Sequence, residues 1–232
     1  MSDTIAPLRP AATILLLRDA PDGLEVWLME RARSVGFMAS AWVFPGGRVD
    51  PGDADAPAVG GEHPDIPRAF WVAAARELWE EAGVRLGDDG AWDVRAMTPW
   101  AHWITPEVEP RRYDTWFFAA ALPAGAEATP DGREASRGGW YAPAAARALA
   151  MAGALPVAPP TLRTLDELCA FDDVASALGA VRATPPICPR FQQEGEDLWV
   201  LLPGDPAHPS PDAVAPPHRY RFAAGRWWAK GG

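Results

Sequence analysis

Hydrophobic and polar positions alternate in two segments near the start of the chain, and this alternation predicts strands over residues 12–17 and 24–30. The Pro21-Asp22-Gly23 turn between them predicts a hairpin. Further apolar runs predict short strands at 42–44, 94–103, 113–121 and 138–141. Residues 53–67 have no periodicity and are rich in proline, glycine and acidic side chains, which is typical of a loop.

A helical period begins near residue 68. At about 100° per residue, its apolar positions fall in one sector of the helical wheel. These positions are Trp71, Ala74, Ala75, Leu78 and Ala82. The pattern predicts a helix over 68–82 that packs on the sheet and ends at Gly83. Strand, helix and strand in this order favour an α/β or α+β domain with a mixed sheet.

Beyond residue 145 the pattern changes. Helical periodicity covers 142–152 and 162–183, interrupted by the proline cluster at 156–160. Residues 203–217 are too rich in proline for regular structure, and short strands are expected around 198–202, 220–222 and 227–229. We therefore expect a first domain at 10–145, with a loop at about 54–67, and a C-terminal extension at 146–232 packed on it.

Composition narrows the possible functions. Hydrophobic residues make up 48% of the 232 positions, which is enough for a packed core, and the net charge of −10 argues against nucleic acid as the main partner. Cys169 and Cys188 form no CxxC pair, which excludes a disulfide framework and a cysteine zinc site and suits a reducing compartment. No segment approaches the roughly 20 apolar residues of a membrane span. We expect a cytoplasmic protein with a small-molecule substrate, and a homodimer is possible.

The chemistry is concentrated on the predicted helix, where Glu77, Glu80 and Glu81 share one face. Carboxylates at this spacing repel one another, and a hard divalent cation would turn that repulsion into ligation. Taken alone, the trio is more typical of a solvated acidic face balanced by nearby arginines such as Arg76. Its context reverses this interpretation, because a sharp glycine turn, Phe44-Pro45-Gly46-Gly47, lies upstream.

Together these segments resemble the box of the Nudix hydrolase family, G-x5-E-x7-R-E-U-x-E-E-x-G-U, where U is apolar. The matching positions are Gly47, Arg76, Glu77, Leu78, Glu80, Glu81, Gly83 and Val84. Two features depart from the box. Asp53 stands in place of its first glutamate, and 22 residues separate Asp53 from Arg76, which is 15 more than usual. A surface loop tolerates such an insertion at small entropic cost.

The run from Gly36 to Gly47 and the interrupted box are similar to the Nudix branch that cleaves coenzyme A and its thioesters, although Met38 stands where other such enzymes have a histidine. The resemblance implies an α/β/α sandwich and a Mg²⁺- or Mn²⁺-dependent diphosphohydrolase. Glu77, Glu80, Glu81 and the Gly47 carbonyl would hold the metal, and Arg76 would orient the carboxylates. The alternatives are a nucleotide-binding sensor without turnover, or a hydrolase of nucleoside triphosphates or ADP-ribose.

Other site residues are assigned less directly. Glu134 is the first candidate for the general base, and ordinary surface exposure is the competing interpretation. The candidates for gripping phosphate are Arg31, Arg33, Arg111 and Arg112, and Trp103 is a candidate for stacking on a base. Surface charge and core packing are the competing interpretations for these residues. Deletion of residues 56–61 is expected to change substrate preference more than stability.

Overall fold

The computed structural model describes residues 5–32, 40–88 and 90–229. Its largest element is a mixed sheet, in which β10, β7, β8, β1, β2 and β3 follow one another, while β4 pairs with β1 and β9 pairs with β2. The strands are β1 (Leu8–Ala20), β2 (Gly23–Arg31), β3 (Trp42–Val43), β4 (Gly46–Arg48), β7 (Thr98–Ile104), β8 (Arg112–Ala121), β9 (Ala135–Tyr141) and β10 (Pro186–Ile187). The predicted hairpin and the short strands are confirmed, although β7 begins at Thr98 and not at residue 94.

One edge of β1 is divided between two partners. Its first half pairs antiparallel with β4, placing Ala12 opposite Gly47, and its last residues pair with β2. The other edge of β1 pairs with β8 in parallel along ten residues. The short strand β4 therefore brings the glycine turn to the middle of the sheet, beside the start of β1.

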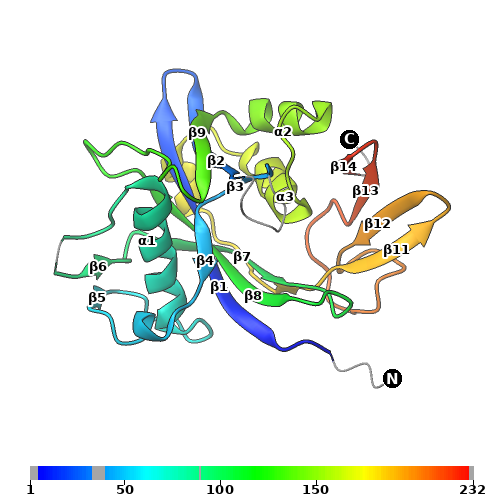
Figure 1. The fold of residues 1–232 in the computed structure, drawn as a ribbon, viewed down its shortest axis with the longest axis horizontal. Helices are drawn as coiled ribbons and strands as arrows, with labels where there is room; N and C mark the ends of the chain where they lie inside the picture. The colour runs from blue at the N-terminus through cyan, green and yellow to red at the C-terminus, as the bar shows by residue number, and fades with distance from the viewer. Residues whose placement is uncertain (1–4, 33–39, 89, 230–232) are drawn as a thin grey trace.

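Alternation along β1 separates the two layers that cover the sheet. Leu15 and Leu17 point into one core cluster, and Ile14 and Leu16 point into the other, because successive side chains lie on opposite faces. Figure 1 shows α1 to the left of this sheet and α2 and α3 to its right. The result is the predicted α/β/α sandwich.

Helix α1 (Arg68–Ala82) has the predicted bounds. All five of its predicted inward-facing apolar side chains are buried. The helix ends because Gly83 adopts a left-handed φ of 68° and its N–H donates to the Trp79 carbonyl. The polar face that remains outside this buried stripe carries the three glutamates.

On the other face lie α2 (Pro143–Ala152), α3 (Pro159–Leu168) and α4 (Val174–Gly179). The prediction of one helix over 162–183 was wrong, because the chain leaves α3 at Cys169 and starts again after Asp173. The Asp173 carboxylate accepts the Ser176 N–H at 2.7 Å and so caps a new helix. Prolines 159 and 160 begin α3, where a missing N–H costs nothing.

The end of the chain forms an antiparallel sheet of four strands. They are β11 (Arg190–Glu194), β12 (Asp197–Leu201), β13 (Arg219–Ala223) and β14 (Arg226–Ala229), of which β11 was not predicted. Val200 and Tyr220 pack from this sheet into the core cluster under α2 and α3. Residues 203–217 form neither helix nor strand, as predicted.

A second small sheet lies beside α1. The predicted loop 53–67 contains strand β5 (Ala58–Val59), which pairs in parallel with β6 (Trp92–Asp93). The short 3-10 helix η1 (Pro51–Asp53) precedes β5 in the chain. The segment is therefore more ordered than its composition indicates. None of the helices in the described ranges has the length and apolar character that a bilayer crossing requires.

Candidate active site

The glycine turn and the polar face of α1 meet through two close contacts. The Gly46 N–H donates to Oε2 of Glu81 at 2.8 Å. A Cβ atom at Gly47 would lie 2.5 Å from Oε1 of Glu77, and one at Gly46 would lie 2.5 Å from the Ala12 carbonyl oxygen. Only glycine fits at either position without displacement, so the carboxylates lie directly against the β4 backbone.

Arg76 connects α1 to the preceding loop. Its Nε and Nη2 donate to Oδ1 and Oδ2 of Asp53 at 2.9 and 3.1 Å, and Nη2 also donates to the Arg48 carbonyl at 2.9 Å. Asp53 is only 3% exposed, and its carboxylate also accepts the Asp50 N–H at 2.7 Å. The hydrogen bonds with Asp53 raise the pKa of Arg76, against the opposing effect of burial. The inserted residues thus leave Asp53 in contact with the box arginine.

Arg76 also holds two of the glutamates. Its Nη1 donates to Oε1 of Glu77 at 2.8 Å and to Oε2 of Glu80 at 3.0 Å. Burial raises the pKa of Glu77, and the charge and hydrogen bond of Arg76 lower it only in part. The guanidinium of Arg76 donates to all three carboxylates and therefore positions Glu77 and Glu80 relative to Asp53.

Glu81 is the most buried of the three glutamates, with 7% of its surface exposed. Burial is the largest cause that raises the pKa of this carboxyl to about 8, and the Gly46 N–H opposes it. The negative charges of Glu77 and Glu134 raise the pKa further, and the positive charge of Arg31 lowers it.

These residues fit a divalent cation by their chemistry. Three carboxylates and a backbone surface without side chains are the oxygen donors that Mg²⁺ and Mn²⁺ prefer. As they stand, no three acidic, histidine or cysteine side chains in the described part of the chain converge closely enough to hold a metal ion. The reason lies in the contacts above, since Glu77 and Glu80 face Arg76 and Glu81 faces Gly46.

Glu134 comes from the loop between β8 and β9. Its carbonyl accepts the Ala32 N–H at 2.7 Å, which joins the loop to the end of β2. Its negative charge raises the pKa of both Glu77 and Glu81. Glu134, predicted as a base, is exposed, and it lies on the loop whose Asp131 N–H donates to the Glu81 carbonyl, more than 50 residues from the glutamates in sequence.

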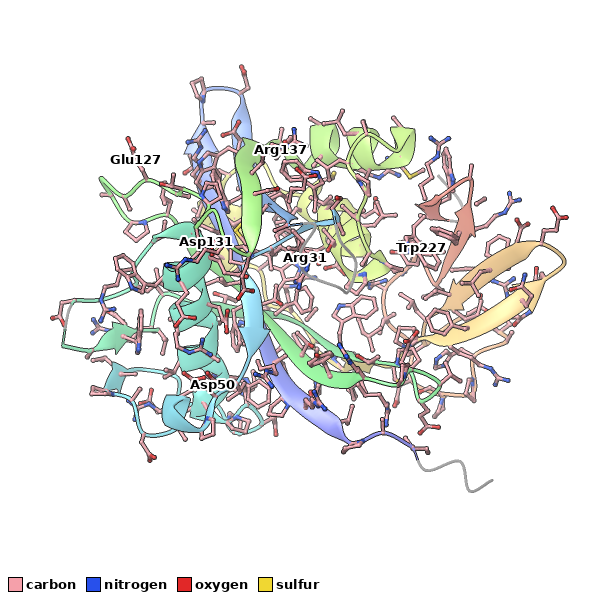
Figure 2. All side chains as sticks on the ribbon, viewed as in Figure 1. Arg31, Asp50, Glu127, Asp131, Arg137 and Trp227 are labelled. Carbon is pink, nitrogen blue, oxygen red and sulfur yellow. The ribbon has the colours of Figure 1, made fainter. Side chains whose placement is uncertain are left out.

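Arg31 ends β2 and lies opposite Ala135 of β9. Its Nε is buried and has no hydrogen-bond partner among the described residues. Figure 2 shows Arg31 on the opposite side of β4 from α1 in that view. A buried donor without a partner, near a carboxylate cluster, is suited to an anionic ligand. Arg33, predicted to act with it, lies outside the described residues.

The remaining candidates lie elsewhere. Arg112 is 8% exposed, and it donates to the Thr105 carbonyl at 3.1 Å and the Ala6 carbonyl at 3.3 Å, so its guanidinium fastens the chain's own backbone. Arg111 is exposed beside it. Trp103 is 5% exposed and belongs to the core cluster on the α2 and α3 face, where its ring serves packing.

Sequence reasoning missed two features of the site. It gave the glycine turn a role only in metal binding, through the Gly47 carbonyl, and did not predict that the Gly46 N–H donates to Glu81. It also assigned nothing to Asp131, although Thr129-Pro130-Asp131-Gly132 is a turn signature. Asp131 accepts three backbone N–H groups and lies beside the end of α1 in Figure 2.

An α/β/α sandwich with a glycine turn against a helix bearing three glutamates defines the class of Nudix enzymes. The model of the NUDIX domain matches residues 7–161, and the chain belongs to the Nudix hydrolase family. Its members act on diphosphate bonds of nucleoside-diphosphate substrates and typically depend on a divalent metal. This chain is accordingly a Nudix hydrolase.

Relatives extend the similarity beyond the matched domain. A Caenorhabditis elegans protein named putative nudix hydrolase 7 is 28% identical over 93% of this chain and 79% of its own length. A Gallus gallus protein named acyl-coenzyme A diphosphatase NUDT19 is 25% identical over 90% of this chain and 82% of its own length. The crystal structure of a NUDIX hydrolase from Alicyclobacillus acidocaldarius superposes with a TM-score of 0.68 at 25% identity, covering 78% of this chain and all of that one.

Proposed function

We propose that this Nudix hydrolase uses Mg²⁺ or Mn²⁺ to cleave the diphosphate of coenzyme A or acyl-coenzyme A. The observation that carries the proposal of hydrolysis is the Glu77–Gly47 contact, where a Cβ atom at position 47 would lie 2.5 Å from a carboxylate oxygen of Glu77. The relatives named acyl-coenzyme A diphosphatase support the choice of substrate.

Glu77, Glu80, Glu81 and the Gly47 carbonyl would hold the metal. When bound, the metal neutralises the phosphate oxygens and makes a coordinated water more acidic. A cation would also favour the ionised form of Glu81, whose pKa is raised in its absence. Arg76, fixed by Asp53, keeps Glu77 and Glu80 in reach of that position.

Two further residues of the chain act on the substrate and the water. The Nε of Arg31, which finds no hydrogen-bond partner in the described part of the chain, donates to a phosphate oxygen and so stabilises the charge that develops during displacement. Glu134 accepts a proton from the attacking water. Water adds across the phosphoric anhydride, the P–O–P bond breaks, and the products from coenzyme A are 3′,5′-ADP and 4′-phosphopantetheine.

The test is a mass-resolved hydrolysis screen with Mg²⁺ and Mn²⁺. Its substrates are coenzyme A, acyl-coenzyme A, ADP-ribose, nucleotide sugars, dinucleoside polyphosphates and nucleoside triphosphates. We expect 4′-phosphopantetheine or its acyl form as the product. Cleavage of another substrate alone would refute the choice of substrate. Binding without any cleavage would identify a nucleotide sensor and overturn the hydrolytic proposal.

Two variants connect the product to the site. Glu81→Gln removes a charge without changing the packing of α1, and we expect turnover to fall by about 10³-fold or more with the fold intact. Glu127→Gln is the matched control, because Glu127 is exposed on the loop between β8 and β9 (Figure 2). Near-normal turnover in Glu81→Gln would overturn the assignment of the metal site.

A further inference from the structure

We infer that Asp131 is a positioning residue, which ties the loop that follows β8 to the end of α1 and so fixes the backbone of Glu134 beside that helix end. The inference rests on the proposed function, since it gives Glu134 its catalytic surroundings. Three sets of hydrogen bonds carry it.

The first set is made by the Asp131 side chain. Its Oδ1 accepts the N–H groups of Arg133 and Glu134 at 3.1 Å and of Ala135 at 2.9 Å, and Oδ2 lies 3.1 Å from the Glu134 nitrogen. Burial acts to raise the pKa of Asp131, but these hydrogen bonds outweigh it and lower the pKa below its ordinary value. One carboxylate therefore folds the next four residues around itself, including the backbone of Glu134.

The second set joins the same loop to the helix. The Asp131 N–H donates to the Glu81 carbonyl at 3.1 Å, and the Thr129 N–H donates to the Ala82 carbonyl at 2.9 Å. The last carbonyls of a helix have no partner within the helix, so the loop satisfies them here. The backbone N–H of Asp131 thus binds the backbone of Glu81. The side chain of Asp131 accepts the backbone N–H of Glu134.

The third set closes the loop on the sheet. The Gly132 N–H donates to the Ala135 carbonyl at 3.1 Å, with Gly132 in the left-handed region at φ 74°. The Ala32 N–H donates to the Glu134 carbonyl at 2.7 Å. Glu134 is therefore held by its N–H toward Asp131 and by its C=O toward β2. Only the first of these links depends on a side chain.

A mere stabilising turn would make the same contacts, so the experiment must separate the two roles. Asp131→Ala removes the acceptor of three N–H groups, whereas Asp131→Asn keeps one oxygen in place. Asp88→Ala is the matched control, because Asp88 also accepts two N–H groups of its own loop, from Gly90 and Ala91, at 2.9 and 3.0 Å. That loop leads into β6, which lies to the left of α1 in Figure 1.

The kinetic arm uses the full chain with Mg²⁺ and coenzyme A. We expect Asp131→Ala to lower kcat about 10- to 100-fold with KM within about twofold, and to flatten the acidic limb of the pH profile, where a general base becomes ionised, while Asp131→Asn retains most activity. Glu134→Gln should lower kcat more, and adding Asp131→Ala to it should cost little further. An unchanged kcat in Asp131→Ala, or a full additional loss in the double variant, would overturn the inference.

Amide hydrogen exchange of the same variants separates failure of this inference from failure of the proposed function. We expect Asp131→Ala to speed exchange in residues 133–135, and Asp88→Ala to leave these residues unchanged. If residues 133–135 of Asp131→Ala exchanged at the wild-type rate, the positioning role would be refuted, whatever substrate the enzyme cleaves. If hydrogen exchange responds as expected but the wild-type enzyme does not cleave coenzyme A, only the proposed substrate is wrong. The kinetic comparison of the variants is then repeated with the substrate that the screen identifies.

Discussion

Gly47 and Glu77 are packed so closely that a Cβ atom at position 47 would lie 2.5 Å from Oε1 of the glutamate. The two residues come from β4 and α1, and 29 residues separate them in the chain. Because the contact point is the flexible end of a side chain, an added methyl group would displace the carboxylate and not the backbone. The contact thus governs where Glu77 points.

Gly47→Ala should therefore reduce activity much more than stability. We expect kcat/KM to fall at least about 100-fold, because the carboxylate moves away from its working position, while the melting temperature changes little. Gly52→Ala is the control, since a Cβ atom there would meet nothing within 4 Å. Equal activities of the two variants would show that the Glu77 position is unimportant.

The pair of Asp53 and Arg76 should matter for stability as well as activity. Their side chains are 4% and 17% exposed, so Asp53→Ala leaves a largely buried guanidinium without its main partner. We expect a loss of about 3 kcal/mol in the free energy of unfolding, measured by urea denaturation. Asp93→Ala breaks the exposed pair with Arg95 and should have no measurable effect. A similar result for both variants would contradict a special role for Asp53.

Asp205 should stabilise the folded protein only at pH values where its carboxyl group is ionised. Two hydrogen bonds from Arg219, at 2.8 and 3.0 Å, lower the pKa of Asp205 against the effect of burial. A folded-state pKa below the unfolded value of about 3.9 adds stability that is fully present above that value and is lost as pH falls through the folded pKa.

Asp205→Asn should accordingly lower the melting temperature at pH 7, and the difference from wild type should shrink below about pH 4. Asp212→Asn serves as the control, because Asp212 is exposed on the same loop. A difference that stays constant between pH 7 and pH 3 would refute the role of the ionised pair.

Deletion of residues 56–61 is now expected to lower stability first, contrary to the expectation from sequence. The segment contains β5, which pairs with β6, and a Cβ atom at Gly61 would lie 3.4 Å from the Trp71 ring. We expect a clear fall in melting temperature, measured together with the substrate screen. Val59→Ser changes an exposed side chain within the same strand and should leave the melting temperature unchanged. A deletion that changed only substrate preference would restore the earlier expectation.

Several helices and strands were predictable because the sequence patterns that specify them are local. The bounds of α1 follow from a 3.6-residue apolar period and a terminal glycine, and the same period puts the three glutamates on one face. The helix predicted over 162–183 failed for a local reason too, since Asp173 offers a cap that restarts the helix. Strand β11 has a weak alternation and gains its place from pairing with β12.

The sequence by itself determined the family and the helix that carries Arg76 and the three glutamates, because the part of the box from Arg76 to Val84 lies within about two helical turns and the glycine that ends them. Tertiary structure alone decided which distant residues reach that helix. Asp53 accepts from Arg76 across the insertion, the Gly46 N–H donates to the Glu81 carboxylate, and the Asp131 N–H donates to the Glu81 carbonyl. These meetings depend on strand register and on loops that satisfy a helix end, and such non-local pairings leave no periodic trace in the chain.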